Sequence, residues 1–501
     1  MNLVAILERH AKEQPSKAAL IHRDRSLDYR GLYGRVRAFA RLLERRGLRA
    51  GSRLLVFVPM SLDLYVVFLG ALHLGVTVVV IDPGMGFVGV EAAARRASCD
   101  ALVAPRSIAW LRWFSAPLRR IPVVFALRPG AMADLVPVES GAPAPVAADA
   151  PALLTFTSGS TGAPKGAVRS HAFLVAQHHA LQEVLALGPG DVDMPALPIF
   201  VLNSLAAGTT CVLPPLPRRV ADVDPAALAE TIRRHRVTTI EASPVLFEAL
   251  TLAGLRHGGP FESVRGAFMG GAPVLPSLHR RLEPWLPNGD SVVVYGSTEA
   301  EPISAASGRR EVAASETLSA SGHGLLVGRP VQSLLARIDG DDDLLVAGAH
   351  VNERYFDDPP AEARHKVQDE HGRIWHRTGD ACRFDDDGRL WLLGRVEHAC
   401  RVDGEKVYPT VIEVAARLID GVGQAAFLLD GSEGVLVADG PGVTDALKRI
   451  HPAISRVVTV RRVPTDRRHN AKIDYATLRR QLRMPVSPPV LPPSPEGRPT
   501  L

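Results

Sequence analysis

The sequence has few cysteines and no paired cysteine motif. Its 501 residues include four cysteines, which lie far apart at Cys99, Cys211, Cys382 and Cys400. Disulfide frameworks and structural zinc sites need cysteines at short, repeated spacings such as Cys-x-x-Cys. The sequence therefore excludes a scaffold held together by disulfides and a zinc site built from cysteine pairs.

Long hydrophobic runs are also missing. The first ten residues carry charges at Glu8 and Arg9 without an extended apolar core, so they do not form a secretory signal. The most apolar segment, 76–81, follows His73 and ends at Asp82, which is typical of a buried strand and not of a membrane span. We therefore expect no transmembrane segment and a cytoplasmic protein.

Concentrated charge is missing as well. The formal net charge of +5 comes mainly from arginines spread along the chain, and pairs such as Arg461-Arg462 and Arg467-Arg468 have no aromatic residues between them. Nucleic-acid-binding segments usually combine a basic cluster with such aromatics. This pattern favours a solvated arginine-rich surface and predicts no nucleic-acid partner.

The chain is too long for one compact core, and its apolar segments alternate with helical patterns. With 46% hydrophobic and 22% charged residues, it has the composition of an ordinary globular protein. No tandem repeat of fixed period is present. The alternation predicts an α/β fold, with strands at 53–59, 76–81, 101–104, 122–125, 238–241 and 292–295 and helices at 27–48, 61–74, 225–235 and 244–253.

A change in composition near Gly394 suggests a domain boundary. Residues 396–483 alternate short strands and helices with apolar positions of their own, and 485–501 are rich in proline and polar residues. We expect a large N-terminal domain at 1–395, a small C-terminal domain at 396–484 and a disordered tail at 485–501.

The stretch that carries the most chemical information is Thr155-Phe-Thr-Ser-Gly-Ser-Thr-Gly-Ala-Pro-Lys-Gly-Ala-Val168. Glycines let backbone N–H groups turn toward an anion, hydroxyls donate to phosphate oxygens, and the Lys165 ammonium neutralises charge. It is not a Walker A loop, because Pro164 precedes the lysine and no Ser or Thr follows it. A flexible surface loop is the alternative, and the length of the pattern disfavours it.

This stretch resembles the signature of the adenylate-forming superfamily, which includes acyl- and aryl-CoA synthetases, luciferases and the adenylation domains of peptide synthetases. The resemblance implies a large α/β domain with a β-rich subdomain and a small mobile α+β lid. It also implies that ATP converts a carboxylate to an acyl-adenylate and releases pyrophosphate. The implied phosphate-binding residues are Thr157, Ser158, Gly159, Ser160, Thr161, Gly162 and Lys165.

A second motif, Val292-Val-Val-Tyr-Gly-Ser-Thr-Glu299, is a strand that runs into a tight turn. Ligands of open α/β sheets bind at the carboxyl ends of the strands. An aromatic ring can stack on a purine, and a carboxylate beside a triphosphate can hold Mg²⁺. The resemblance assigns Tyr295 and Gly296 to the nucleotide, Thr298 to catalysis and Glu299 to the metal. A strand-end turn with a solvated glutamate is the alternative.

Two further segments match the superfamily's nucleotide site. Gly270-Gly-Ala-Pro273 offers backbone without bulky side chains and resembles the loop that contacts adenine, through Gly270, Gly271, Ala272 and Pro273. Residues 384–392 predict a hairpin with an Asp-Gly turn. Asp380, before this hairpin, can accept both ribose hydroxyls, and Arg395, after it, can reach ribose or phosphate.

Lys472, in His469-Asn-Ala-Lys-Ile473, matches the superfamily lysine that stabilises charge during adenylation. Ala471 replaces the usual glycine of that motif. Glu397 occupies the position of the hinge between the two domains, where Asp or Lys is commoner.

The acyl pocket is expected around Leu197-Pro-Ile-Phe-Val-Leu-Asn203, with Phe200, Val201 and Asn203 as lining residues. Val201 stands where typical CoA ligases carry histidine. Together with segments at 374–380, 388–394 and 407–409, the run at 469–473 resembles the olefin-pathway β-lactone synthetases. That resemblance implies a fatty or β-hydroxy fatty acid whose own hydroxyl displaces AMP.

Three alternatives stay open at this point. The acyl group could pass to CoA, an aryl or amino acid could be loaded onto a carrier protein, or the chain could bind nucleotide without turnover. Intact Lys165, Glu299, Asp380 and Lys472 disfavour the last of these. The sequence gives neither the chain length of the acid nor the oligomeric state.

Overall fold

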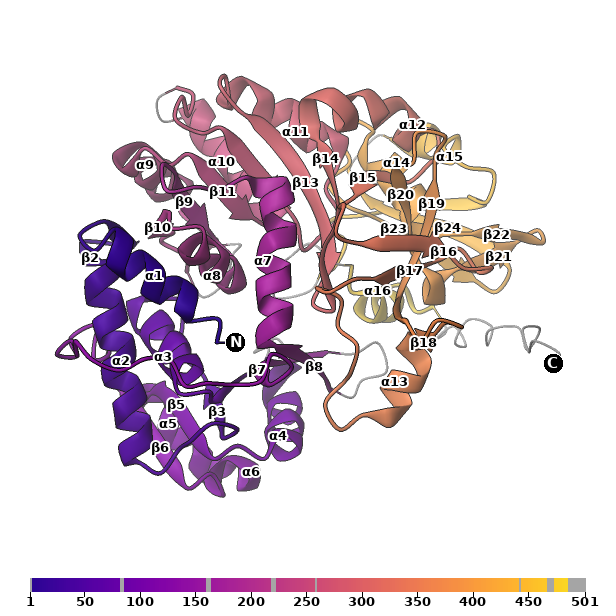
Figure 1. The fold of residues 1–501 in the computed structure, drawn as a ribbon. Helices are drawn as coiled ribbons and strands as arrows, with labels where there is room; N and C mark the ends of the chain where they lie inside the picture. The colour runs from indigo at the N-terminus through magenta and orange to yellow at the C-terminus, as the bar shows by residue number, and fades with distance from the viewer. Residues whose placement is uncertain are drawn as a thin grey trace.

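Two large sheets with helices around them form most of the molecule (Figure 1). The computed structural model describes residues 2–81, 85–158, 164–217, 222–256, 259–440, 443–465 and 473–484. The phosphate-loop residues 159–163, Lys472 and the tail from 485 onward lie outside these ranges.

The first sheet has six strands in the order β6-β5-β3-β4-β7-β8, all parallel except the antiparallel pair β7–β8. Its strands are β3 (Arg53–Val56), β4 (Thr77–Ile81), β5 (Ala101–Pro105), β6 (Val123–Leu127), β7 (Pro151–Ser158) and β8 (Pro164–Ser170). The flanking helices are α2 (Tyr29–Arg45), α3 (Leu62–His73), α4 (Gly86–Ala97), α5 (Arg106–Ala109), η2 (Trp110–Phe114) and α6 (Ala116–Arg119).

Side chains that alternate along these strands pack against helices on opposite faces. Leu54 and Val78 belong to the core shared with α2 and α3, whereas Leu55 and Val79 belong to the core shared with α4 and α6. Successive strand residues point to opposite faces, so near-continuous apolar strands predict a sheet covered on both sides. The expected α/β architecture is confirmed here.

The second sheet joins a parallel half to an antiparallel half in the order β16-β17-β19-β20-β15-β14-β13-β12-β11-β9-β10-β1-β2, with β18 paired to β19. The parallel half and its edge contain β1 (Ala18–His22), β2 (Arg25–Asp28), β9 (Val192–Pro195), β10 (Thr210–Leu213), β11 (Thr239–Ala242), β12 (Gly266–Met269) and β13 (Asp290–Ser297). The antiparallel half contains β14 (Ala300–Ser307), β15 (Leu325–Pro330), β16 (Leu335–Ile338), β17 (Asp343–Ala347), β18 (Lys366–Gln368), β19 (Ile374–Phe384) and β20 (Leu390–Arg395). This half is the expected β-rich subdomain.

The other helices of the N-terminal part connect these strands. They are α1 (Ala5–Glu13), α7 (His171–Leu185), α8 (Pro198–Ala206), α9 (Pro225–His235), α10 (Pro244–Arg256), α11 (Pro276–Leu282), η4 (Glu283–Trp285), η5 (Gly308–Val312), η6 (Ala313–Ser315), α12 (Glu316–Ala320) and α13 (Pro359–His365). Among the residues that the structure describes, no helix is long and apolar enough to cross a bilayer.

The elements after β20 form a compact group with apolar clusters of their own (yellow in Figure 1). They are η7 (Val396–His398), β21 (Cys400–Val402), β22 (Glu405–Val407), α14 (Pro409–Arg417), β23 (Ala425–Asp430), β24 (Glu433–Asp439), α15 (Thr444–Lys448), β25 (Arg456–Val460) and α16 (Tyr475–Leu482). They contact the N-terminal part through Val414, which packs on Leu275 and Leu325.

Two local expectations differ from the structure. The helix expected at 27–48 begins at Tyr29, because Leu27 pairs in β2 and the Asp28 side chain caps the helix by accepting from the Gly31 N–H. Both ends of the phosphate-binding stretch are strands, since Thr157 in β7 pairs with Lys165 in β8. The motif is therefore a β-hairpin rather than one continuous loop.

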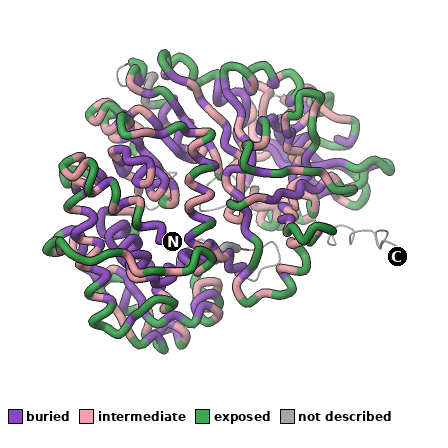
Figure 2. Tube along the Cα trace, viewed as in Figure 1, coloured by how far each residue is buried: buried purple, intermediate pink, exposed green. Residues whose placement is uncertain are grey.

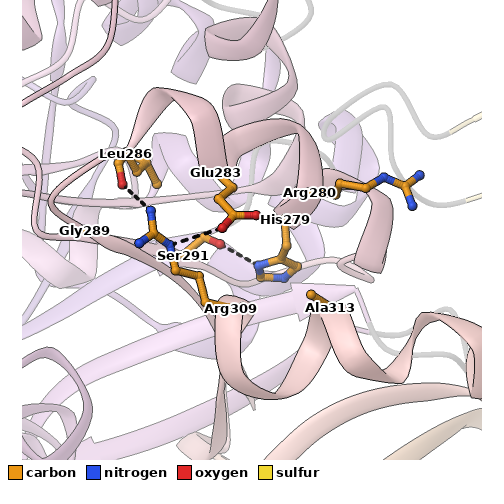
Figure 3. A pocket seen from close by; sticks show the side chains of 9 residues that line it. His279, Arg280, Glu283, Leu286, Gly289, Ser291, Arg309 and Ala313 are labelled. Atoms are coloured by element: carbon orange, nitrogen blue, oxygen red, sulfur yellow. Dashed lines mark hydrogen bonds and ion pairs between the residues drawn. The ribbon is translucent and has the colours of Figure 1, made fainter.

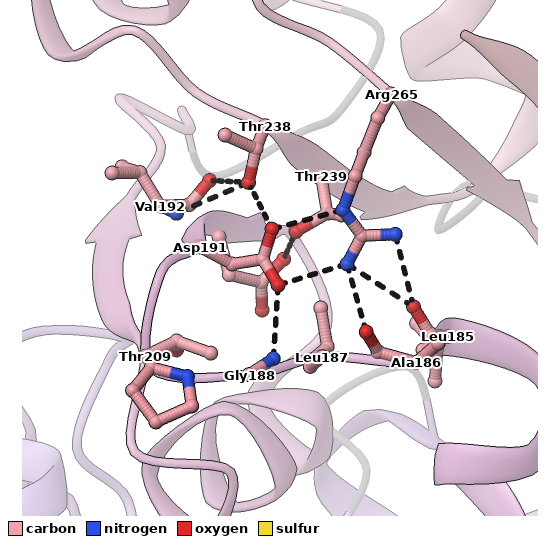
Figure 4. A network of polar contacts seen from close by, with 12 residues as sticks. Leu185, Ala186, Leu187, Gly188, Asp191, Val192, Thr209, Thr238, Thr239 and Arg265 are labelled. Atoms are coloured by element: carbon pink, nitrogen blue, oxygen red, sulfur yellow. Dashed lines mark hydrogen bonds and ion pairs between the residues drawn. The ribbon is translucent and has the colours of Figure 1, made fainter.

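A polar cluster ties together the amino ends of β9, β11 and β12 (Figure 4). The Arg265 guanidinium donates two hydrogen bonds of 2.9 Å to Asp191, and the Thr238 hydroxyl donates to Asp191 at 2.8 Å. Arg265 also donates to the Ala186 carbonyl at the end of α7. This cluster fixes one edge of the parallel half, and the opposite, carboxyl edge is the one that the Gly270 and Tyr295 motifs occupy.

The interior of both sheets is buried, and exposed residues lie mainly on outer helices and connections (Figure 2). Helix α3 is an extreme case, because all twelve of its residues are buried. A helix that is apolar on all sides is typical of a core position. The α3 helix therefore lies in the core that packs against the first sheet.

Candidate active site

Lys165 stands at the start of β8, where the hairpin returns from the phosphate loop. Its side chain is nearly buried, and Nζ lies 2.8 Å from Nε2 of His365, at the end of α13. Burial lowers the pKa of Lys165, and the neighbouring Arg364 lowers it further, whereas Glu299 raises it. The charged neighbours of Lys165 include Glu299, Asp358 and Arg364, and an ammonium at this position can also bind an incoming polyphosphate.

Glu299 lies in the turn between β13 and β14. Its Oε1 accepts a hydrogen bond of 2.9 Å from the Tyr355 hydroxyl. Burial alone would raise the pKa of Glu299, but His376, the Tyr355 hydroxyl and Lys366 lower it below its ordinary value. Because burial and Lys366 reduce the pKa of His376 to about 3, that histidine is neutral at physiological pH, and Tyr355 and Lys366 carry the effect.

Lys366 adds a second cation, half-buried, beside Glu299. Its Nζ donates to the Asn352 carbonyl and lies 5.0 Å from the centre of the Tyr355 ring. Burial lowers the pKa of Lys366 to about 8, against the opposing effect of Glu299. The Asn352 N–H in turn donates to the Glu299 carbonyl at 2.6 Å. The Tyr355 hydroxyl thus bonds to the Glu299 carboxylate, the Asn352 N–H bonds to the Glu299 backbone carbonyl, and Lys366 acts on the carboxylate electrostatically.

Tyr295, Asp380 and Arg395 contact one another directly, and their roles toward a nucleotide stay predictions. The Tyr295 hydroxyl donates to Asp380 Oδ2 at 2.7 Å, and Arg395 Nη1 lies 2.7 Å from Asp380 Oδ1. In the β19–β20 ladder Asp380 and Arg395 are cross-strand partners, which explains why the two motifs must flank one hairpin. Burial beside Asp380 raises the pKa of Tyr295, so the hydroxyl keeps its proton.

Thr298 is held through its backbone. The buried Arg169 guanidinium, from β8, donates to the Thr298 carbonyl at 2.7 Å and 3.2 Å. Arg169 also interacts electrostatically with Glu301, whose carboxylate accepts from Gln177 at 3.2 Å. These contacts couple the phosphate hairpin to the turn that carries Glu299.

Glycines keep the backbone open at the expected adenine loop. A Cβ at Gly270 would lie 2.8 Å from the Val294 carbonyl oxygen, and a Cβ at Gly296 would lie 2.8 Å from the Ala300 carbonyl oxygen. Gly271 has a φ of +79°, a conformation that disfavours residues with a Cβ. Ala272 and Pro273 follow directly. Gly270 and Gly296 are therefore required by close packing, and Gly271 is favoured by its backbone conformation, independently of any ligand.

The expected acyl-pocket residues lie on α8. Val201 is completely buried in the core below the first sheet, and Phe200 packs with Leu181 and Phe268. The Asn203 Oδ1 lies 2.7 Å from Nδ1 of His178. Their role toward a substrate stays a prediction.

Several predicted site residues lie outside what the structure describes. Gly159, Ser160, Thr161, Gly162 and Lys472 are outside the described residues, as are the side chains of Thr157 and Ser158. Glu397 is exposed in η7 and interacts electrostatically with both Lys165 and Arg395, so the expected hinge borders the site.

A separate small pocket is remote from this site (Figure 3). It has a volume of about 10 Å³, room for one water, between His279, Ser291, Gly308 and Arg309. Ser291 and Gly308 lie near the amino end of β13, opposite to Tyr295 and Glu299. Burial lowers the pKa of His279 to about 4, which makes it a neutral partner of the Ser291 hydroxyl at 2.7 Å.

Sequence reasoning missed Tyr355, His365, Lys366 and Arg169. None belongs to a short glycine-rich or charged motif, and three come from 355–366, a segment with no distinguishing pattern in the sequence. The isolated bridge between Ala167 and Tyr355 brings that segment to the phosphate hairpin. The only signal in the sequence that could have found these residues was the presence of a charged residue between predicted strands.

A family model described as AMP-binding enzyme matches residues 7–351. The chain belongs to the AMP-binding enzyme family. The match covers Lys165, Tyr295 and Glu299, which all belong to the candidate active site. This AMP-binding enzyme is an adenylate-forming ligase that uses ATP, as the sequence motifs predict.

Full-length relatives include the olefin β-lactone synthetases of Stenotrophomonas maltophilia and Xanthomonas campestris. Each is 30% identical, over 94% of this chain and 96% of the relative. The pyochelin synthetase PchE of Pseudomonas aeruginosa is 31% identical over 85% of this chain, but over only 29% of its own length. The AMP-binding enzyme thus resembles one part of that longer protein.

Solved structures share the fold. The amide bond synthetase McbA from Marinactinospora thermotolerans has a TM-score of 0.81 at 23% identity, covering 96% of this chain and 99% of that one. The ATP-bound MatB from Rhodopseudomonas palustris has a TM-score of 0.80 at 20% identity, covering 96% and 99%. The predicted adenylate-forming fold is therefore confirmed.

Proposed function

We propose that this AMP-binding enzyme activates a β-hydroxy fatty acid with ATP and then closes the acyl-adenylate to a β-lactone. In the first step a carboxylate oxygen bonds to the α-phosphorus and pyrophosphate leaves. In the second, the β-hydroxyl oxygen bonds to the acyl carbon, AMP leaves and the hydroxyl proton passes to solvent. An internal hydroxyl has a high effective molarity, so no external thiol is needed.

The observation that carries this proposal is the match with olefin β-lactone synthetases across nearly the whole of both chains. A carrier-loading function receives less support, because the carrier-linked relatives are matched over about a third of their length or less. Val201, buried in the core where CoA ligases carry histidine, is consistent with an enzyme that does not depend on CoA.

Each residue of the site has a role in this scheme. Lys165 and the loop of Thr157–Gly162 would hold the phosphates, Tyr295 and Gly270–Pro273 the adenine, and Asp380 with Arg395 the ribose. Phe200, Val201 and Asn203 would border the acyl chain. Lys472 would enter from the C-terminal domain to stabilise charge on the α-phosphate.

Glu299 fits a magnesium site. Mg²⁺ in nucleotide-binding enzymes is commonly held by one or two carboxylates together with substrate phosphates. The Glu299 carboxylate has a lowered pKa and lies near the buried Lys165, where phosphates are expected. Within the described residues no three His, Cys, Asp or Glu side chains cluster, which agrees with a metal held mainly by ATP. Bound Mg²⁺ would neutralise phosphate charge.

The domain division at 395–396 is part of the proposal. The separate clusters around Phe427 and Leu428 support an independent C-terminal unit with η7 as the pivot. A cytoplasmic location stays a prediction from the sequence.

The decisive test supplies purified enzyme with ATP, Mg²⁺ and a long-chain β-hydroxy acid, with and without CoA. We expect pyrophosphate release without CoA and a product that has lost one water, detected by mass spectrometry. The matched acid without the hydroxyl is the control, and it should stop at acyl-AMP. If a thioester forms with CoA and no dehydrated product forms without it, the second step is CoA ligation and not lactone closure.

A further inference from the structure

Large aromatic side chains are exposed on one short segment of the first domain. Trp110, Trp113 and Phe114 are 52%, 62% and 71% exposed, and the neighbouring Ile108 is 37% exposed. All four come from α5 and η2. Single exposed apolar residues need no explanation, but a contiguous group of this kind marks an interaction surface.

Arginines frame these aromatic residues. Arg106, Arg119 and Arg120 are exposed, and Arg112 is half-buried. No acidic residue occurs between positions 101 and 133. We call Ile108, Trp110, Trp113 and Phe114, together with Arg106, Arg112, Arg119 and Arg120, the aromatic–arginine patch.

The patch is an ordered surface. The Trp110 and Phe114 rings meet edge to face at 5.5 Å, and the Arg112 guanidinium lies 5.2 Å from the centre of the Trp113 ring. Arg119 donates to the Trp113 carbonyl at 3.2 Å, and Trp110 Nε1 donates to the Ser107 carbonyl at 2.7 Å. These contacts fix the positions of the exposed rings. Less side-chain conformational entropy is therefore lost when the patch binds a partner.

Its position leaves it accessible. Helices α5 and α6 lie on the outer side of the first sheet, away from the C-terminal elements (Figure 1). The nearby helix α4 contacts α6 and contributes Arg95 and Arg96 along with one acid, Glu91. Arg96 is paired with Asp358 at 2.9 Å and the charge of Glu91 offsets that of Arg95, so the positive charge of this surface comes from the arginines at 106, 112, 119 and 120.

We propose that the aromatic–arginine patch docks on an anionic lipid bilayer. Tryptophan and phenylalanine rings insert at the level of the headgroups, and arginines attract anionic lipids. Stable peripheral binding usually combines two such signals, and the patch supplies both. Single-stranded nucleic acid fits less well, because base stacking needs open ring faces and the Trp113 ring already carries Arg112.

The test measures co-sedimentation of the full-length enzyme with vesicles of phosphatidylcholine, or of phosphatidylcholine mixed with phosphatidylglycerol. We expect about tenfold stronger partitioning onto the anionic vesicles, lost at about 1 M salt, where the Debye length falls to about 3 Å. The variants Trp113→Ala/Phe114→Ala and Arg119→Glu/Arg120→Glu should each reduce partitioning about tenfold or more. Equal binding to both vesicle types, or none, would overturn the proposal.

Matched controls replace similar side chains elsewhere. Phe384→Ala removes another exposed aromatic residue, and Arg461→Glu/Arg462→Glu reverses another arginine pair. Neither should change vesicle binding, and adenylation of a water-soluble acid should be the same in all variants. Equal losses in the controls would contradict a specific patch.

Two further measurements keep the proposal testable if a variant does not fold. Brominated lipids in anionic vesicles should quench wild-type tryptophan fluorescence, because Trp110 and Trp113 are exposed, whereas Trp285 is half-buried and Trp375 and Trp391 are buried. No quenching would overturn the proposal. Wild-type self-association abolished by Trp113→Ala/Phe114→Ala, or displacement from vesicles by single-stranded oligonucleotide, would assign the patch to a protein or nucleic-acid partner instead.

Discussion

At the scale of single residues, the site depends on keeping the half-buried Glu299 carboxylate ionised. Glu299 is half-buried, and desolvation by itself favours the protonated acid. The Tyr355 hydroxyl and the Lys366 ammonium oppose this effect from a segment some 56 to 67 residues further along the chain. A carboxylate that is already ionised can bind a metal–nucleotide complex without first losing a proton.

Tyr355→Phe should impair adenylation without unfolding the enzyme. The substitution removes the 2.9 Å hydrogen bond to Glu299 and raises the pKa of that carboxylate. Hydrogen bonds to charged groups contribute about 1.5–3 kcal/mol, so we expect kcat/KM for ATP to fall about tenfold or more in a pyrophosphate-release assay. Tyr29→Phe is the control, because its hydroxyl donates to the Thr209 carbonyl away from the site. Equal effects of both substitutions would contradict a role through Glu299.

Lys472→Ala tests the lysine that the sequence alone assigns. Loss of one preorganised charge should reduce the rate of adenylation by about two to three orders of magnitude. Turnover of synthetic acyl-AMP should be affected much less, since the α-phosphate bond is already made. Rapid-quench measurement of both half-reactions separates the two. An adenylation rate equal to that of the wild type would mean that Lys472 is an ordinary surface lysine.

How far the site could be predicted depends on the kind of residue. Asp380, Arg395 and Tyr295 belong to short motifs with their own chemical logic, and the structure brings them together. His365 and Lys366 act through tertiary contacts between the 355–366 segment and the phosphate hairpin. Their burial changes their pKa values. The burial of a single residue cannot be predicted from one sequence without its fold.

At the scale of elements, local patterns fixed most strands and helices, and tertiary pairing changed the rest. The helix predicted at 225–235 is α9 with the same bounds, since Pro225 begins it and Asp224 caps it. By contrast, the glycines and hydroxyls of residues 155–168 predict a phosphate-binding loop, and the structure differs from this at residues 164–170. These residues are strand β8 because β7 supplies a complete hydrogen-bonded partner.

The polar cluster at the amino ends of β9, β11 and β12 makes stability depend on pH. Burial alone would raise the pKa of Asp191, but Arg265, the Gly188 N–H and the Thr238 hydroxyl lower it below its ordinary value. The stability it contributes is therefore complete above the unfolded-state pKa of about 4 and is lost as the pH falls further.

Asp191→Asn should accordingly reduce the free energy of unfolding by about 2 kcal/mol at pH 7, less if solvent screens the partly exposed Arg265. The difference from the wild type should shrink at pH 3. Urea unfolding followed by circular dichroism measures it. Asp134→Asn, at the exposed pair with Arg25, is the matched control and should change little. A difference independent of pH would contradict the charge-based account.

At the scale of the whole molecule, the C-terminal elements contact the N-terminal part through polar bonds and through small apolar clusters. Tyr408 and Lys406 both bond to Asp342, at 2.8 Å and 3.0 Å, and Val414 packs on Leu275 and Leu325. Interfaces of mixed polar and apolar character between the parts of one chain permit relative motion of domains. The connection runs through η7, whose Glu397 interacts electrostatically with Lys165 and Arg395.

Glu397→Pro should therefore separate the two half-reactions. Proline fixes φ near −65°, close to the value of a 3₁₀ turn such as η7, so the substitution restricts rotation at the pivot. If the C-terminal domain turns between steps, adenylation should stay near the wild-type rate while product formation from acyl-AMP slows about tenfold or more. Glu397→Ala is the matched control, because it removes the same charge beside Lys165 and leaves the backbone free to rotate. Thermal unfolding of each variant shows whether the fold survives. Slowing of both half-reactions by Glu397→Pro in a folded enzyme, or of the second half-reaction by Glu397→Ala to the same extent, would place the pivot elsewhere.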